Sequence, residues 1–233
     1  MVKKTLVAGI MVAGACLIFL IDAVAQNKEL QNSQFYKHYQ MQYIFGRKYN
    51  DGDVMKNSLY ALIALDPNDD SLKVNLAYYY IENNQYPSSL FVTADILSRN
   101  SNNREALRIN AISYENMGLR DKAISQYESL YLLSNDLLVL YQIAMLQYEL
   151  SRPTECNTNL DIIIKNPQAK TLKLNFPKTE REQQAVTLEA GSYYLKGMVE
   201  LERGNKAEAK KQFEKALEVQ SDFEEVKRKN AEL

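Results

Sequence analysis

The sequence predicts an all-α fold of about five helix pairs stacked along the chain. Two matching series of positions predict it, because residues that suit a close helix crossing recur about every 34 residues until the last interval, which is 19 residues longer. In the second helix of each pair these positions are separated by 34, 34, 33 and 53 residues, at Met55, Ser89, Ala123, Cys156 and Ala209. The first helices repeat the same separations at Tyr43, Ala77, Ala111, Ala144 and Gly197.

Residues 1–25 predict a secretory signal peptide. Lys3 and Lys4 precede an apolar run over 6–21, and small residues at 23–25 precede Gln26. The run is long for a signal, so an uncleaved membrane anchor is an alternative, and lipidation of Cys16 is a third. Each alternative places the rest of the chain outside the cytoplasm. We expect a periplasmic or secreted protein, or one whose membrane contact is this segment alone.

Residues 34–166 contain the first four predicted pairs. Pro67 follows the first pair, and Pro87 and Pro153 begin second helices, where a missing N–H is tolerated. In the first pair Tyr43 and Met55 are bulky for a crossing, and Gly46 stands where later pairs carry larger residues. We therefore expect the first pair to be distorted or splayed.

Residues 169–189 interrupt the helical pattern. Leu172, Leu174 and Phe176 alternate with Lys173 and Asn175, a polar stretch follows over 177–181, and alternation returns near Val186. This pattern predicts a β-hairpin. A two-stranded hairpin is marginal alone, so its apolar face should pack on the fourth or fifth pair. An irregular loop is the alternative.

Residues 190–220 carry the fifth pair, and their sequence resembles a tetratricopeptide repeat. Gly197 and Ala209 occupy the two crossing positions, and Gly204 occupies the turn between the helices. The resemblance implies a right-handed superhelical solenoid whose first helices line a concave face. Residues 221–233 predict a capping helix that begins with a capping box, Ser221 to Glu224.

The search for catalytic chemistry finds little in this sequence. Hydrophobic residues make up 46%, charged residues 24%, and the net charge is -1, which gives no indication of nucleic-acid binding. His38 is the single histidine, and we expect it at the surface. Cys156 occupies a helix crossing and is expected to be inert. Asp66 to Asp70 lacks the glycine and glutamate of a calcium loop. We predict no catalytic, cofactor-binding or metal-binding residues, and a protein that is not an enzyme.

The resemblance places a partner-binding groove on the concave face. The predicted groove residues are Val74, Tyr78, Arg108, Ile112, Tyr141, Met145, Tyr148, Tyr194, Met198 and Leu201. Exposed Tyr, Met and Ile side chains suit the binding of a helix or an extended peptide. The alternative is that these residues pack on one another or under the hairpin. The Lys and Asn cluster with which tetratricopeptide cochaperones hold a C-terminal carboxylate is missing, so an acidic chaperone tail is not the expected partner.

These observations together predict a non-catalytic scaffold of the cell envelope that binds a protein or peptide segment in the apolar groove. The alternative is a structural component that assembles with further copies of itself, in which case the protein is a homo-oligomer. An enzyme is the third and least supported class.

Overall fold

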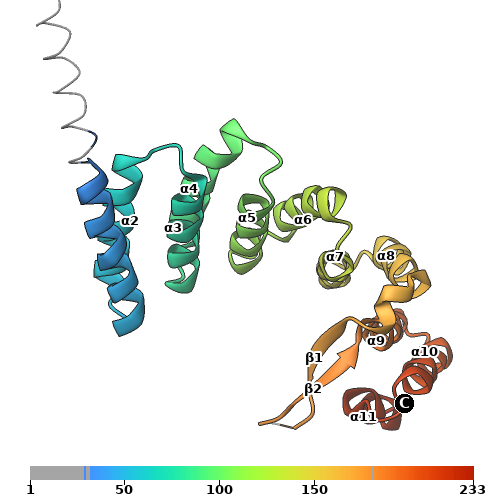
Figure 1. Cartoon of the computed structure of the whole chain (residues 1–233). Helices are drawn as coiled ribbons and strands as arrows, with labels where there is room; N and C mark the ends of the chain where they lie inside the picture. Colours follow the sequence, from blue (N-terminus) through green and yellow to red (C-terminus); the bar gives the residue numbers. More distant parts are fainter. Residues whose placement is uncertain (1–28, 30–31, 180) are drawn as a thin grey trace, which may run out of the picture. The chain divides into compact units, whose positions relative to one another are not determined.

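The computed structural model describes residues 29, 32–179 and 181–233 (Figure 1). The predicted signal segment, residues 1–25, lies outside this range. The chain divides into two compact units, residues 1–83 and 84–233. The described part of the first unit contains a helix over 32–49, then α2 (Gly52–Leu65) and α3 (Asp70–Glu82). No helix within the described ranges is both long and apolar enough to cross a membrane.

The described part of the second unit contains seven long helices, a short 3-10 helix, a hairpin and a short last helix. In order these are α4 (Tyr86–Arg99), α5 (Arg104–Asn116), α6 (Arg120–Ser134), α7 (Leu137–Glu149), α8 (Pro153–Lys165), η1 (Pro167–Lys170), β1 (Lys173–Pro177), β2 (Gln183–Thr187), α9 (Leu188–Glu202), α10 (Lys206–Val219) and α11 (Glu224–Ala231). Helices α5 and α6, α7 and α8, and α9 and α10 pack as pairs. The predicted fold class is confirmed: helix pairs recur, and a hairpin precedes the last pair.

One residue in the left-handed conformation lies in each turn from a first helix to a second helix. These residues are Asn50, Asn84, Gly118, Ser151 and Gly204, which repeat the 34, 34, 33 and 53 spacing. After four of these turns the next backbone N–H donates to the carbonyl five residues earlier, at 2.8 Å: Asp51 to Gly46, Leu119 to Tyr114, Arg152 to Gln147, and Asn205 to Glu200. This is the hydrogen bond of a Schellman motif, which stops a helix and reverses the chain.

The first helix of each later pair begins at a side-chain cap. Asp69, Asn103 and Asp136 accept from backbone N–H groups at the starts of α3, α5 and α7, and Thr187 does the same for α9. These caps satisfy N–H groups that the first turn leaves without helical partners. Each of these four later repeats therefore has a side-chain cap where it begins and a left-handed residue at its internal turn.

In the first pair, small and large residues exchange places between the two helices at one contact. Gly46 is buried, and a Cβ atom on it would lie 2.8 Å from Met55 Cγ and 2.9 Å from Met55 N. The large Met55 side chain thus packs against a glycine one turn further along the first helix. The bulk at Met55 is accommodated by Gly46 at this contact.

The hairpin packs on α9, which confirms the strand prediction. The strands are antiparallel, with Leu174 opposite Val186 and Phe176 opposite Gln184. A Cβ atom at Gly191 would lie 2.6 Å from Leu174 Cδ1 and 3.3 Å from the Phe176 ring. Glycine at this position therefore lets the apolar face of the hairpin approach α9 closely.

The last helix begins differently from the prediction. Its N-cap is Phe223, which makes no side-chain cap, so the capping box from Ser221 to Glu224 is wrong. The N–H of Glu224 donates instead to Gln184 Oε1 at 3.2 Å, and Gln184 Nε2 donates to the Asp222 carbonyl at 2.6 Å. A hairpin side chain therefore caps the helix, and the Phe223 side chain at the N-cap position is fully buried.

The crossing of α9 and α10 gives a test of the packing. A Cβ atom at Gly197 would lie 2.3, 2.5 and 2.9 Å from three atoms of the buried Phe213 ring. We expect Gly197→Ala to lower the free energy of unfolding by about 1–3 kcal/mol, because the ring must move in a filled core. Urea unfolding followed by circular dichroism measures this. A Phe213→Leu background is the control: the same alanine should cost less there, and equal costs would contradict the contact.

Candidate protein-binding groove

A groove of about 380 Å³ lies beside α7, α9 and β1 in the second unit. We call it the α7–α9 groove. It is lined by Tyr141, Gln142, Met145, Tyr148, Leu174, Asn175, Phe176, Pro177, Tyr194, Leu195 and Met198. Most of these side chains are apolar or aromatic, as in sites that bind peptide segments.

Helical spacing brings the helix residues of the groove together. Tyr141, Met145 and Tyr148 are four and three residues apart on α7, and Tyr194 and Met198 are four apart on α9, so each set shares one face. Met145, Tyr148 and Met198 are half-buried, which leaves part of each side chain accessible. With the half-buried Tyr194, these three side chains form the accessible apolar surface of the helical wall.

Tyr141 belongs to the floor of the groove. It is 7% exposed, and its hydroxyl lies 3.5 Å from the Gly191 carbonyl, to which it donates. Burial raises the pKa of the Tyr141 phenol, because the charged form would lose its hydration. This side chain supports the groove from below and exposes little surface to a partner.

Tyr194 is held by an aromatic cluster. The centroid of its ring lies 5.4 Å from that of Phe176 on the hairpin, 5.6 Å from Phe223 before α11 and 5.9 Å from Phe213 on α10. Burial raises the pKa of Tyr194 to about 12, and the neighbouring Glu225 carboxylate adds to the shift. Tyr194 was predicted to face the groove, with packing under the hairpin as the alternative. It does both in part, since it lines the groove and its ring contacts Phe176 on the hairpin.

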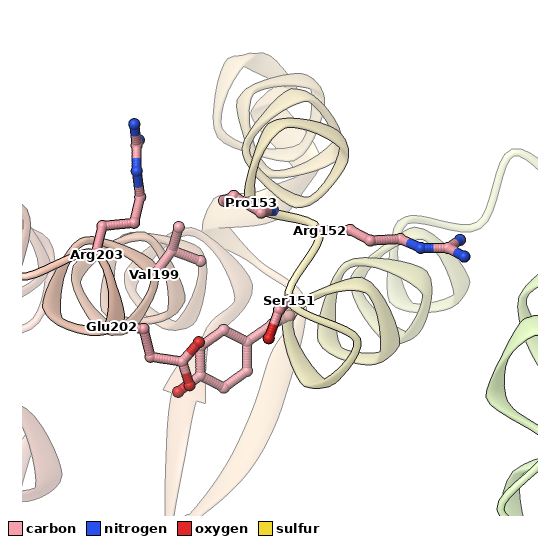
Figure 2. A pocket seen from close by; sticks show the side chains of 7 residues that line it. Ser151, Arg152, Pro153, Val199, Glu202 and Arg203 are labelled. Carbon is pink, nitrogen blue, oxygen red and sulfur yellow. The ribbon is translucent and has the colours of Figure 1, made fainter.

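A second pocket of about 220 Å³ adjoins the groove at Tyr148. Figure 2 shows Val199 and Glu202 on α9 facing Ser151 and Pro153, which lie at the connection between α7 and α8, and Arg152 and Arg203 complete the lining. Burial raises the pKa of Tyr148, and its hydrogen bond with Glu202 raises it further. Both guanidinium groups turn away from the pocket (Figure 2). Arg152 Nη2 lies 2.6 Å from Asp121 Oδ1, and Arg203 Nη1 lies 3.1 Å from Glu200 Oε1.

The acidic side chains near the groove already have donors. Glu115 accepts from the Tyr127 hydroxyl at 3.0 Å and from Gln142 Nε2 at 2.8 Å. Burial raises the pKa of Glu115, and these two hydrogen bonds oppose the shift. Glu149 Oε2 lies 2.5 Å from Arg120 Nε. These two carboxylates are therefore engaged within the protein.

The structure brings five of the ten predicted groove residues together. Tyr141, Met145, Tyr148, Tyr194 and Met198 line the α7–α9 groove. Five others do not line it, namely Val74, Tyr78, Arg108, Ile112 and Leu201. In the first unit Tyr78 lines a separate pocket of about 220 Å³ with Tyr43, Arg47, Met55, Asn75, Tyr79 and Glu82.

The remaining predicted residues are placed as follows. Val74, Arg108 and Ile112 are half-buried on α3 and α5, and Arg108 Nε lies 4.0 Å from Glu105 Oε1. Leu201 packs against the buried cluster around Phe213. Sequence reasoning missed the four hairpin residues of the wall, Leu174 to Pro177. Their alternation indicated a strand, but only Gly191, a glycine inside a helix, could have indicated where the strand packs.

The residues considered for chemistry lie apart from the groove. Cys156 is fully buried, and burial raises the pKa of its thiol to about 12, as expected for a packing residue. His38 is exposed, with its ring centroid 5.3 Å from that of Tyr39. Within the described ranges, no group of three His, Cys, Asp or Glu side chains could hold a metal ion.

Recurring helix pairs and an apolar groove along their first helices define a helical repeat protein. Residues 190–223 match a family model described as tetratricopeptide repeat. The chain therefore contains a tetratricopeptide repeat, and its fold is that of tetratricopeptide repeat proteins, which generally act as scaffolds for protein–protein interaction. A comparison with curated proteins gives no match.

Solved structures share the fold. A crystal structure of MamA protein is 15% identical, with a TM-score of 0.64, and the match covers 81% of this chain and 93% of that one. A tetratricopeptide repeat protein from Parabacteroides merdae ATCC 43184 is 18% identical, with a TM-score of 0.66, covering 85% and 72%. MamA from Desulfovibrio magneticus RS-1 is 11% identical, with a TM-score of 0.62, covering 81% and 97%. At these identities the likeness concerns the fold alone.

The raised pKa of Tyr194 predicts a dependence of stability on alkaline pH. Because the folded pKa of about 12 exceeds that of an unfolded tyrosine, the neutral phenol favours folding below pH 10, and this contribution is lost as pH rises toward 12. We expect the melting temperature of the natural protein to fall relative to that of Tyr194→Phe between pH 10 and 12. Thermal unfolding by circular dichroism measures this difference, and a constant difference across that interval would refute it.

Proposed function

We propose that this protein is a non-catalytic scaffold that binds a segment of a partner protein in the α7–α9 groove. The accessible apolar surface of Met145, Tyr148 and Met198 carries this proposal. Exposed apolar side chains that line one concave site contribute affinity when a partner covers them. The tetratricopeptide repeat fold supports the same class of function.

We also propose that the scaffold acts outside the cytoplasm, in the periplasm or after secretion. The basic and apolar pattern of residues 1–25 supports this location, and the small residues at 23–25 support cleavage before Gln26. Retention of the segment as a membrane anchor is the alternative, with the repeats on the same side of the membrane.

Self-assembly is the second candidate function, and two exposed side chains favour it. Phe91 on α4 is 80% exposed and Leu132 on α6 is 78% exposed. Both lie on second helices of their pairs, away from the α7–α9 groove. Large apolar side chains with so much exposed surface are candidates for contact with another copy.

Substitutions with lysine distinguish binding in the α7–α9 groove from binding at the surface that carries Leu132. We expect Met145→Lys and Met198→Lys each to weaken partner binding by at least about tenfold, because a lysine ammonium would have to be desolvated in the groove. The measurement is crosslinking in the native cell envelope, followed by mass spectrometry of the adducts. Leu132→Lys is the matched control and should retain the adducts.

If the adducts are lost only with Leu132→Lys, the surface that carries Leu132 is favoured as the binding site in place of the groove. Light scattering on the same proteins then shows whether that surface joins copies of the chain. If all three variants retain the adducts of the natural protein and remain folded, the groove has no role in binding.

Cleavage of the N-terminal segment is tested separately. We expect the protein purified from its native host to begin at Gln26, because the residues at 23–25 suit signal peptidase. Intact mass spectrometry measures the N-terminus. A mass that includes residues 1–25 would establish the anchored form, and an added lipid mass at Cys16 would establish the lipidated one.

A further inference from the structure

The two edges of the hairpin differ in their hydrogen bonding. Along β2, Gln220 Oε1 accepts from the Thr187 N–H at 2.9 Å, and Gln220 Nε2 donates to the Ala185 carbonyl at 3.1 Å. One side-chain amide thus bonds the outer edge of β2 as a third strand would. The outward groups of β2 belong to residues 185 and 187.

The strand register shows which groups β1 turns outward. Ala185 pairs with Asn175, and Thr187 pairs with Lys173. In an antiparallel ladder, two opposed residues either bond each other or both turn their N–H and C=O groups outward. Lys173 and Asn175 therefore present their backbone groups on the free edge of β1. Within the part of the chain that the structure describes, these groups have no hydrogen-bond partner.

The free edge of β1 faces the α7–α9 groove. Four consecutive residues, Leu174 to Pro177, line it. Side chains of a strand alternate between faces, so four successive residues line one site only when the edge of the strand borders it. Lys173 and Asn175 are exposed, which leaves the edge accessible. A strand edge and an apolar pocket thus adjoin each other.

The edge is short because Pro177 ends it. Proline has no N–H, and the Pro177 carbonyl lies 3.5 Å from Arg228 Nη2, which donates to it. Lys173 and Pro177 are also residues that limit unwanted pairing at a strand edge. Two residues, each with one N–H and one C=O, remain available to another chain.

We propose that the partner segment binds by strand addition, as a third strand hydrogen-bonded to Lys173 and Asn175. This inference rests on the proposed function and specifies how the groove is used. The inward side chains of the added strand enter the pocket beside Met145 and Met198, and its outward side chains face solvent. Backbone bonds give affinity that is independent of sequence, and the pocket selects apolar side chains at alternate positions.

The positive charge of Lys173 indicates which residues the partner carries on its solvent-facing side. Lys173 is exposed and has no ion-pair partner within the described ranges. The carboxylates of Glu115 and Glu149 already accept from donors of this chain. An opposite charge placed across from Lys173 on the neighbouring strand is stabilising. The occupant is therefore an extended segment of another protein, with alternating apolar residues and an acidic residue on its polar face.

The test uses an immobilised array of synthetic nine-residue peptides. All alternate Val or Leu with Thr, and Glu replaces each Thr in turn, in both chain directions. A second set places the same residues at helical spacing. We expect purified protein to bind the alternating set, with preference for members that contain Glu. If the protein binds none of the alternating peptides, strand addition is overturned.

Variants at Asn175 isolate the backbone hydrogen bond. Asn175→Pro removes the outward N–H and leaves the ladder to β2 unchanged, because residue 175 does not bond β2. Asn175→Ala removes the side chain and retains the N–H. We expect at least about tenfold weaker peptide binding for the proline variant and little change for alanine. Equal binding by the two folded variants overturns the proposal; circular dichroism and the melting temperature establish folding.

Two further measurements distinguish a failure of strand addition from a failure of the proposed binding in the α7–α9 groove. Lys173→Glu should reverse the preference, so that peptides with Lys in place of Glu bind better. Met198→Lys should weaken binding of both peptide sets if the groove is the site. Binding of helical peptides that is sensitive to Met198→Lys and insensitive to Asn175→Pro would retain the groove and reject strand addition. Binding insensitive to every variant rejects both.

Discussion

Each helix pair in this protein depends on a single residue that adopts the left-handed backbone conformation. Glycine takes this position twice, at Gly118 and Gly204, and Asn50, Asn84 and Ser151 take it in the other pairs. Glycine adopts a positive φ without steric penalty, and asparagine adopts it more readily than most residues. In the second unit the turns at Gly118, Ser151 and Gly204 let α6, α8 and α10 reverse beside α5, α7 and α9. Without them the faces of α7 and α9 would not lie along one side of the unit.

The hairpin gives the last pair its individual character. Gly191 admits Leu174 and Phe176 against α9, and Gln184 and Gln220 bond the hairpin to the connection between α10 and α11. The same insertion forms one wall of the groove and caps the final helix. Binding surface and C-terminal stability therefore depend on one segment, which lies between two repeats and belongs to neither.

Much of the fold could be predicted from the sequence, because crossings and turns impose small or special residues at a fixed spacing. The hairpin followed from alternation. The capping box at Ser221 was wrong since the N–H of Glu224 is bonded by Gln184, which is distant in sequence. The candidate groove was predicted in part: helical faces placed Met145 and Met198 together, but no periodicity shows that Asn175 lies beside them or that Tyr141 is buried. Such contacts depend on tertiary packing.

The bond between Gln220 and β2 has a consequence for solubility. A sheet that is open on both sides can template copy after copy, and such propagation leads to fibres. Here a glutamine amide forms hydrogen bonds along one side of the sheet. The sheet can accept a guest strand on the other side, but it offers no route for indefinite growth through the hairpin.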